Sequence, residues 1–141
     1  MESLDRQKTD SDCGPTALHG ALKLYGVKAY YQDVYRLAGT DPEKGTSAAG
    51  LKRALESLKV PLKEYSSKSR PAAWNWIRHQ SHPTILSVDS DNHWILLIAG
   101  SGRRVTVFDP ELGIRIYGRK EFLNRWVNPI GGFYGIQLLR P

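Results

Sequence analysis

The hydrophobic pattern changes character about halfway along the chain. Up to residue 58, apolar residues recur at steps of three and four, as on one face of a helix. From residue 83 onward, short apolar and β-branched runs alternate with clusters of Gly, Asp, Asn and Ser, as in strands joined by tight turns. Helices followed by strands with short connections predict an α+β domain with N-terminal helices packed on a C-terminal antiparallel sheet.

The first half predicts helices separated by turn residues. Pro15 suits a first helical turn, and Gly26 is a natural stop for the helix that follows it. Thr46 or Ser47 can cap a later helix. Residues 1–12 are polar and short of apolar anchors, so we expect an extended arm there. The predicted helices cover residues 15–25, 31–37, 48–58 and, more briefly, 71–80.

The second half predicts strands. Residues 89–92, Asp-Ser-Asp-Asn, have the composition of a turn, and Gly100-Ser101-Gly102 has it again eight residues later. The predicted strands cover residues 84–88, 93–99, 104–108, 114–117 and 133–139, with a helical turn over residues 120–126.

Length and composition restrict the class of protein. The 141 residues, 40% hydrophobic and 10% aromatic, predict one folded domain over residues 1–141. The longest apolar run, residues 94–99, is far shorter than the roughly 20 residues of a membrane span. The charged N-terminus does not resemble a secretory signal. We therefore expect a protein without a membrane span, cytoplasmic or exported by a signal-peptide-independent system.

The net charge of +6 favours acidic partners at long range but is modest for this length. The basic residues of the second half lack interleaved aromatic residues for stacking on bases, so we interpret them as solvated faces and expect no nucleic-acid binding. They are Arg103, Arg104, Arg115, Arg119, Lys120 and Arg125.

Cys13 is the single cysteine, which excludes an internal disulfide and a multi-thiolate zinc site. It is either a packed thiol or a nucleophile. It lies at the polar-to-apolar junction where the first helix begins, beside Gly14. A helix N-terminus favours thiolate over thiol, so this position favours the nucleophile.

A thiolate nucleophile needs a base, and His93 is the best-placed histidine. It opens a predicted strand directly after a polar turn, although a core histidine is an equal interpretation from the residues alone. His19 is about two-thirds of a turn away from the Cys13 face of the first helix. His79 and His82 have no further ligands nearby, so we expect no metal and no cofactor.

The base needs an orienting acceptor, and the reaction needs an oxyanion donor. Asp109 ends the next predicted strand, and a hairpin turning near residues 100–102 would bring it to His93. The alternative for Asp109 is a turn-initiating aspartate before proline. Gln7, six residues before Cys13, could donate its amide N–H beside the thiolate, although alone it would be dismissed as a solvated polar residue.

In this order and spacing, the motifs resemble the bacteriocin-processing cysteine peptidases, papain-like domains that precede ABC exporters and cut leader peptides after a double glycine. The resemblance covers nearly the whole chain, and implies Cys13 as nucleophile, His93 as general base and acid, Asp109 as orienting residue and Gln7 as oxyanion donor. The matching segments are Gln7, Asp12-Cys13-Gly14, Gly45-Thr46-Ser47, Gly50-Leu51-Lys52, Pro83-Thr84-Ile85-Leu86, His93, Asp109-Pro110, Glu121-Phe122-Leu123 and Trp126.

The resemblance predicts a papain-like cysteine peptidase that acts on a peptide or protein without a cofactor. Double-glycine cleavage implies a cleft that is narrow beside Cys13, with Trp94, Trp74 and Trp76 as candidate walls. Members are usually joined to an exporter, and no such part follows within these 141 residues. The alternative is therefore an effector or toxin domain with the same triad that cleaves or deamidates a target-cell protein and is neutralised by an acidic inhibitor or immunity protein. A non-catalytic peptide-binding module is a third interpretation.

Overall fold

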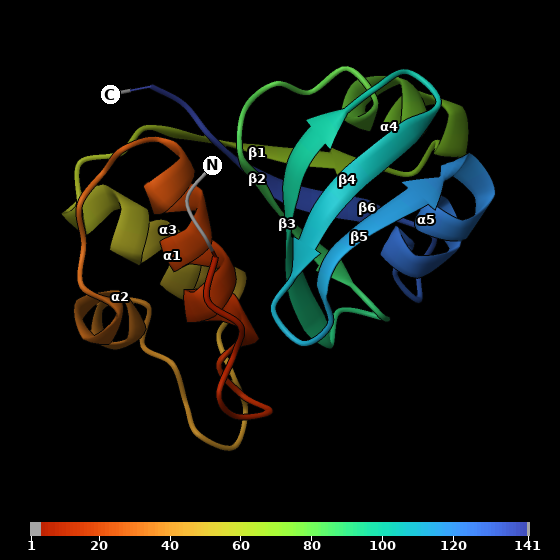
Figure 1. Ribbon diagram of the computed structural model, residues 1–141. Helices are drawn as coiled ribbons and strands as arrows, with labels where there is room; N and C mark the ends of the chain where they lie inside the picture. The colour runs from red at the N-terminus through yellow and green to blue at the C-terminus, as the bar shows by residue number, and fades with distance from the viewer. Residues whose placement is uncertain (1–3, 141) are drawn as a thin grey trace.

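The computed structural model describes residues 4–140 and places helices on both faces of one sheet (Figure 1). One face is covered by α1 (Cys13–Leu24), α2 (Tyr31–Leu37) and α3 (Ala48–Ser57). The other is covered by α4 (Arg70–Ile77) and α5 (Arg119–Trp126). The predicted α+β class, with helices against an antiparallel sheet, is confirmed.

The sheet has six antiparallel strands among the described residues, in the order β1-β6-β2-β3-β4-β5. From β2 to β5 the strands follow one another as a meander, whereas β6 lies between β1 and β2. The strands are β1 (Leu62–Ser67), β2 (Thr84–Val88), β3 (His93–Gly100), β4 (Arg104–Asp109), β5 (Gly113–Gly118) and β6 (Phe133–Leu138).

Strand β1 was missing from the sequence prediction. Its residues are Leu-Lys-Glu-Tyr-Ser-Ser, which offer only two large apolar side chains, and it lies at the edge of the sheet. An edge strand needs little hydrophobic patterning when its partner holds it, and here β6 pairs with all six residues. The predicted order, with four helices before the first strand, therefore misses β1, which precedes α4.

Alternating strand residues divide the interior into two cores. Leu96 and Phe108 pack with α1 on one face, while Ile95 and Val107 pack with α5 on the other. Because successive residues of a strand point to opposite faces, each fully buried strand serves both cores. The sheet therefore separates the two groups of helices.

Local contacts fix where the helices of the first group lie. The Ser47 hydroxyl accepts from the Gly50 N–H at 3.0 Å, so Ser47 rather than Thr46 caps α3. A Cβ at Gly50 would lie 2.1 Å from the Ala38 carbonyl oxygen, so only glycine allows this approach of α3 to the end of α2.

The described part of the arm, residues 4–12, connects the two halves of the molecule. Leu4 packs against the core around α1, and the Gln7 N–H donates to the Pro110 carbonyl oxygen at 2.8 Å, in the turn after β4. Arg6 also donates to the Glu111 carbonyl oxygen in this turn. The arm is therefore docked on the sheet as well as joined to α1.

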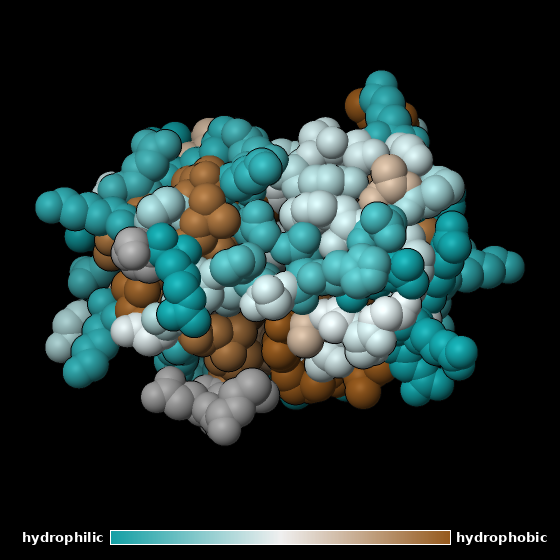
Figure 2. Space-filling view, turned by 90° about the horizontal axis from the view of Figure 1, so that it is seen from above, coloured by the Kyte–Doolittle hydropathy of each residue, from teal (hydrophilic) through white to brown (hydrophobic). Residues whose placement is uncertain are grey.

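Polar residues cover most of the face shown in Figure 2, and hydrophobic residues gather in a few places. Within residues 4–140, no helix has both the length and the apolar character that crossing a membrane requires.

Candidate active site

Cys13 is the first residue of α1, and its surroundings are set by the preceding Asp12. The Asp12 carboxylate accepts from the N–H groups of Lys8 and Thr9, both at 3.0 Å, and from the Tyr31 hydroxyl at 2.8 Å. Burial raises the pKa of Asp12, but these hydrogen bonds outweigh burial and lower it. An ionised Asp12 thus holds residues 8 and 9 of the arm against the start of α1.

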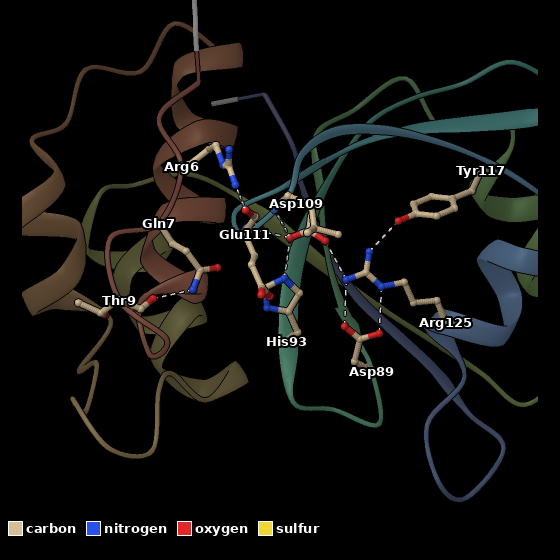
Figure 3. A network of polar contacts seen from close by, with 10 residues as sticks. Arg6, Gln7, Thr9, Asp89, His93, Asp109, Glu111, Tyr117 and Arg125 are labelled. Carbon is tan, nitrogen blue, oxygen red and sulfur yellow. Dashed lines mark hydrogen bonds and ion pairs between the residues drawn. The ribbon is translucent and has the colours of Figure 1, made fainter.

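His93 and Asp109 come together from neighbouring strands. The β3–β4 pairing aligns Leu96 with Phe108 and Leu97 with Val107, so the first residue of β3 lies near the last residue of β4. His93 Nε2 lies 2.8 Å from Asp109 Oδ1, and the Asp109 side chain is fully buried (Figure 3). The hairpin expected from the sequence therefore brings these two residues into direct contact.

The electrostatics of this pair favour the charged forms of both groups. Burial opposes protonation of His93, but the hydrogen bond to Asp109 and the neighbouring Cys13 raise its pKa to about 9. Burial raises the pKa of Asp109, but hydrogen bonds from His93, Arg125 and the Glu111 N–H outweigh burial and lower it. Near neutral pH the pair is therefore an imidazolium beside a carboxylate.

Arg125 is a residue of this site that the sequence interpretation missed. Its Nη2 lies 2.7 Å from Asp109 Oδ2, and its side chain is only 16% exposed. It was assigned to a solvated basic face, which is wrong for this residue. The signal that could have identified it is its place three residues after Phe122 and directly before Trp126, at the edge of the buried face of α5.

Gln7 is near the site, but its amide is used elsewhere. The amide nitrogen donates to the Thr9 carbonyl oxygen, and the amide oxygen is buried with no hydrogen-bond partner among the described residues. The structure therefore brings Gln7 to the turn after Asp109, without a hydrogen bond from its amide to Cys13.

The other three histidines are held by structural hydrogen bonds. His19 Nε2 lies 3.0 Å from the Ala29 carbonyl oxygen, and His79 Nδ1 lies 2.8 Å from the Asn75 carbonyl oxygen. His82 Nδ1 hydrogen-bonds the Tyr25 hydroxyl. Across residues 4–140, no three His, Cys, Asp or Glu side chains are grouped so as to hold a metal ion.

A cleft between the helices and the sheet opens at Cys13. Its volume is about 470 Å³, and a neighbouring hollow of about 500 Å³ shares Thr46, Asp91 and Trp94 with it. The Trp94 indole N–H donates to the Thr46 carbonyl oxygen at 2.8 Å, across the two sides of the cleft. The residues that line the cleft are Asp10, Ser11, Cys13, Pro42, Glu43, Lys44, Gly45, Thr46, Asp91, Asn92 and Trp94.

Of the three tryptophans proposed as walls, only Trp94 lies in the cleft. A Cβ at Gly14 would lie 2.7 Å from the Thr46 Cβ and 3.3 Å from Trp94 Cδ1, so these two side chains pack against α1 at the residue after Cys13. Trp74 belongs to the core on the α4 side of the sheet, and Trp76 packs against that core. The expectation that these two line the cleft was wrong.

Comparison with solved structures finds the same fold in known peptidase domains. The structure superposes on a double glycine motif protease of an AMS/PCAT transporter, determined in complex with the leader peptide, with a TM-score of 0.80 and 18% identity over 97% of this chain and 91% of that one. It superposes on the peptidase domain of Streptococcus ComA, a bi-functional ABC transporter involved in quorum sensing, with a TM-score of 0.78 and 20% identity over the whole of both chains. Both likenesses indicate the papain-like fold.

Sequence relatives span different lengths. The lactococcin-A transport/processing ATP-binding protein of Lactococcus lactis is 30% identical over 125 residues, which are 85% of this chain and 17% of that protein. The probable functional amyloid protease of Pseudomonas aeruginosa is 32% identical over 132 residues, which are 87% of this chain and 56% of that protein. This chain thus spans between about a sixth and just over half of these relatives. Residues 2–130 match the Peptidase C39 family, and the chain is therefore a papain-like cysteine peptidase of that family.

Proposed function

We propose that this peptidase cuts a polypeptide after a double glycine, with Cys13 as nucleophile, His93 as general base and acid, Asp109 as orienting residue and Gln7 as oxyanion donor. The observation that carries the proposal is the 2.8 Å contact between His93 Nε2 and Asp109 Oδ1. It commits one ring nitrogen to the carboxylate and leaves Nδ1 for the thiol of Cys13, which is near enough to raise the pKa of His93.

In the first half-reaction, the Cys13 thiolate attacks the carbonyl carbon of the scissile peptide bond. The C–S bond forms, the carbonyl π electrons move to oxygen, and a tetrahedral oxyanion results. The oxyanion then collapses, the C–N bond breaks, and the His93 imidazolium gives its proton to the leaving amine. The products are a free amino terminus and a thioester on Cys13.

In the second half-reaction, neutral His93 takes a proton from a water molecule as that water attacks the thioester carbonyl. The C–S bond breaks, the carboxylic acid leaves, and the proton on His93 restores the imidazolium beside the thiolate. Asp109 keeps its charge throughout, because its role is to hold the ring orientation and stabilise the imidazolium.

The oxyanion in both half-reactions needs donors beside Cys13. The Cys13 backbone N–H, as the first N–H of α1, has no partner within the helix. The Gln7 amide nitrogen carries two N–H bonds, and only one is needed for the Thr9 carbonyl oxygen. Its second N–H is the other donor that we propose.

The crowding beside Cys13 supports the double-glycine specificity. Thr46 and Trp94 line the cleft together with Cys13 and pack against α1 at Gly14, so we expect a side chain on either substrate residue to meet them before the carbonyl carbon comes within about 3–3.5 Å of the sulfur. A steric restriction of this kind rejects larger residues without requiring tight binding of the preferred ones.

Affinity for such a substrate has to come from a segment further upstream. A hollow of about 550 Å³ beyond the C-terminal half of α1 offers an apolar lining of Val27, Ala29, Tyr30 and Leu58. Tyr30 is 82% exposed, the largest fraction among the exposed large hydrophobic residues of the described chain. We propose that the apolar side of an amphipathic leader binds here, so Tyr30→Ala should raise KM for leader-bearing peptides only.

The nucleophile is tested with Cys13→Ala. Activity should disappear while the melting temperature changes little, because Cys13→Ala removes only the sulfur atom from a residue that is 6% exposed and packs in the core around α1. Iodoacetamide should label wild-type Cys13 rapidly near neutral pH, and His93→Ala should slow that labelling at pH 6 by at least about tenfold. If Cys13→Ala retains activity, or loses several degrees in Tm, the packed-thiol interpretation of Cys13 is favoured instead.

The specificity is tested with peptides that carry Gly-Gly, Ala-Gly, Gly-Ala or Leu-Arg before the cleavable bond, each behind the same amphipathic leader. Gly-Gly should be cut fastest, as measured by kcat/KM. If Leu-Arg is cut faster than Gly-Gly, the narrow-cleft argument fails, and an effector that accepts varied protein targets is favoured instead.

A further inference from the structure

Arg125 connects α5 to the turn after β2 and to strands β4 and β5, beside the proposed catalytic residues. Its Nε and Nη2 donate to the two carboxylate oxygens of Asp89, each at 2.9 Å, and its Nη1 lies 2.9 Å from the Tyr117 hydroxyl (Figure 3). Its Nη2 also makes the 2.7 Å ion pair with Asp109 Oδ2. One mostly buried guanidinium thus contacts two carboxylates that lie 20 residues apart in the chain.

The contact with Asp109 fixes the rotation of that carboxylate. Oδ1 accepts from His93 Nε2, from the Glu111 N–H at 2.9 Å and from the Leu112 N–H at 3.3 Å. Oδ2 is buried, has no aligned hydrogen bond within residues 4–140, and is held by the ion pair with Arg125. Without the guanidinium, Oδ2 would lose its counter-charge inside the protein, and only the contacts of Oδ1 would hold the orientation of the carboxylate toward His93.

The contact with Asp89 fixes the turn that leads into His93. Asp89, Ser90 and Asp91 have φ of 54°, 59° and 64°, three successive residues in the left-handed region that residues other than glycine rarely adopt. The Asp89 N–H also donates to the Arg125 carbonyl oxygen at 2.9 Å, so both the main chain and the side chain of this residue are held by Arg125. The position of the first residue of β3 therefore depends on α5.

We propose that Arg125 is a positioning residue for the reaction: it orients the Asp109 carboxylate and the turn before His93 together, and its fixed charge sets the pH range in which Cys13 and His93 form their ion pair. The inference rests on the proposed function. It assigns Arg125 a role through Asp109 and Asp89, without contact to the substrate or to the reacting atoms.

The positive charge of Arg125 shifts the titration of nearby acids in one direction. Arginine stays protonated at all working pH values, and the positive charge favours deprotonation of every acid near it. Removing it should move both limbs of the activity profile to higher pH, because the thiolate is then less favoured and the imidazolium more favoured. Neutralising Asp89 removes a negative charge from the same network, so it should move both limbs to lower pH.

The test compares Arg125→Met, Arg125→Lys and Asp89→Asn, with Arg119→Met as the matched control. Arg119 begins the same helix, is exposed, and lies outside the network. The first measurement is the pH dependence of Cys13 alkylation by iodoacetamide, which needs no substrate and reports one thiol because the chain has one cysteine. The second measurement is kcat and KM for a Gly-Gly peptide, with thermal unfolding as the check on folding.

In Arg125→Met, the midpoint of the rise in alkylation rate should move up by at least about 0.5 pH unit, and in Asp89→Asn it should move down. Arg125→Met should lower kcat at least about tenfold with little change in KM, because the groups are misplaced rather than the substrate. Arg125→Lys should restore the midpoint, but not kcat, since an ammonium cannot make the two-pronged contact with Asp89. Arg119→Met should match the wild type.

Two results would overturn the proposal: midpoints that stay within experimental error in Arg125→Met and Asp89→Asn, or shifts of the same sign in both. If Arg125→Met does not fold, Asp89→Asn and Arg125→Lys still test the proposed role of Arg125. Failure of the proposed function would look different, because wild-type Cys13 would then react no faster than free cysteine. Rapid wild-type labelling with unmoved midpoints would refute the role of Arg125 alone.

Discussion

The raised pKa of His93 predicts a specific loss of stability at alkaline pH. An unfolded chain protonates histidine with the ordinary pKa of 6.5, whereas the folded protein does so at about 9. Below pH 6.5 the ring is protonated in both states, and the full stabilisation is present. As pH rises through 9 the folded protein loses the proton too, and the stabilisation disappears. The difference corresponds to about 3 kcal/mol of unfolding free energy.

His93→Gln isolates this contribution, because glutamine is neutral at every pH. We expect the wild type to exceed His93→Gln in unfolding free energy by up to about 3 kcal/mol more at pH 6 than at pH 10, with the decline centred between pH 6.5 and 9. Denaturant titrations of reduced protein at several pH values measure it. His79→Gln, which changes an exposed histidine outside the candidate site, is the control variant.

If the difference between wild type and His93→Gln is the same at pH 6 and pH 10, the imidazolium is not stabilised by the folded structure. The pairing with Asp109 would then add nothing to the free energy of folding, and the electrostatic account of the site would be refuted. Measurements should stay above pH 5, because the lowered pKa of Asp109 means that its own contribution is lost as pH falls.

Three further changes test separate parts of the structure. Gln7→Ala should lower kcat by about 10²–10³ with unchanged KM, as loss of one oxyanion donor does; an unchanged kcat would remove Gln7 from the site. Gly50→Ala should destabilise the fold by about 2 kcal/mol or more in denaturant titrations, because its Cβ would lie 2.1 Å from the backbone oxygen of Ala38. Ser69→Ala removes the hydroxyl that accepts from the Ala72 N–H at the start of α4 and should cost about 1 kcal/mol with kcat/KM unchanged.

Local patterns made most of the fold predictable. Gly26 and Ser47 marked a helix end and a helix start, and the turn before His93 separated two strands as expected, because these signals act within a few residues. β1 was not predictable in the same way, since its polar sequence becomes a strand only through β6, about 70 residues later.

The residues of the candidate site also divide into those that local sequence patterns predict and those that only the tertiary structure brings together. The contact of His93 with Asp109 followed from one hairpin, so its two residues could be paired from the sequence. The role of Arg125 depends on Asp89, 36 residues away, and on the burial of one edge of α5, neither of which local pattern reveals. The orientation of the Gln7 amide depends on how the arm folds over Asp12, which also needs the tertiary structure.

The central place of β6 has a consequence for how the protein is made. A ribosome synthesises the chain from the N-terminus toward the C-terminus. Cys13, His93 and Asp109 are therefore all made before residues 133–138. Until those residues emerge, β1 has no strand to pair with, and β2 has one unpaired edge, because β6 pairs with both strands. The sheet that supports the cleft is therefore complete only after β6 is inserted, and a nascent chain should acquire peptidase activity only then.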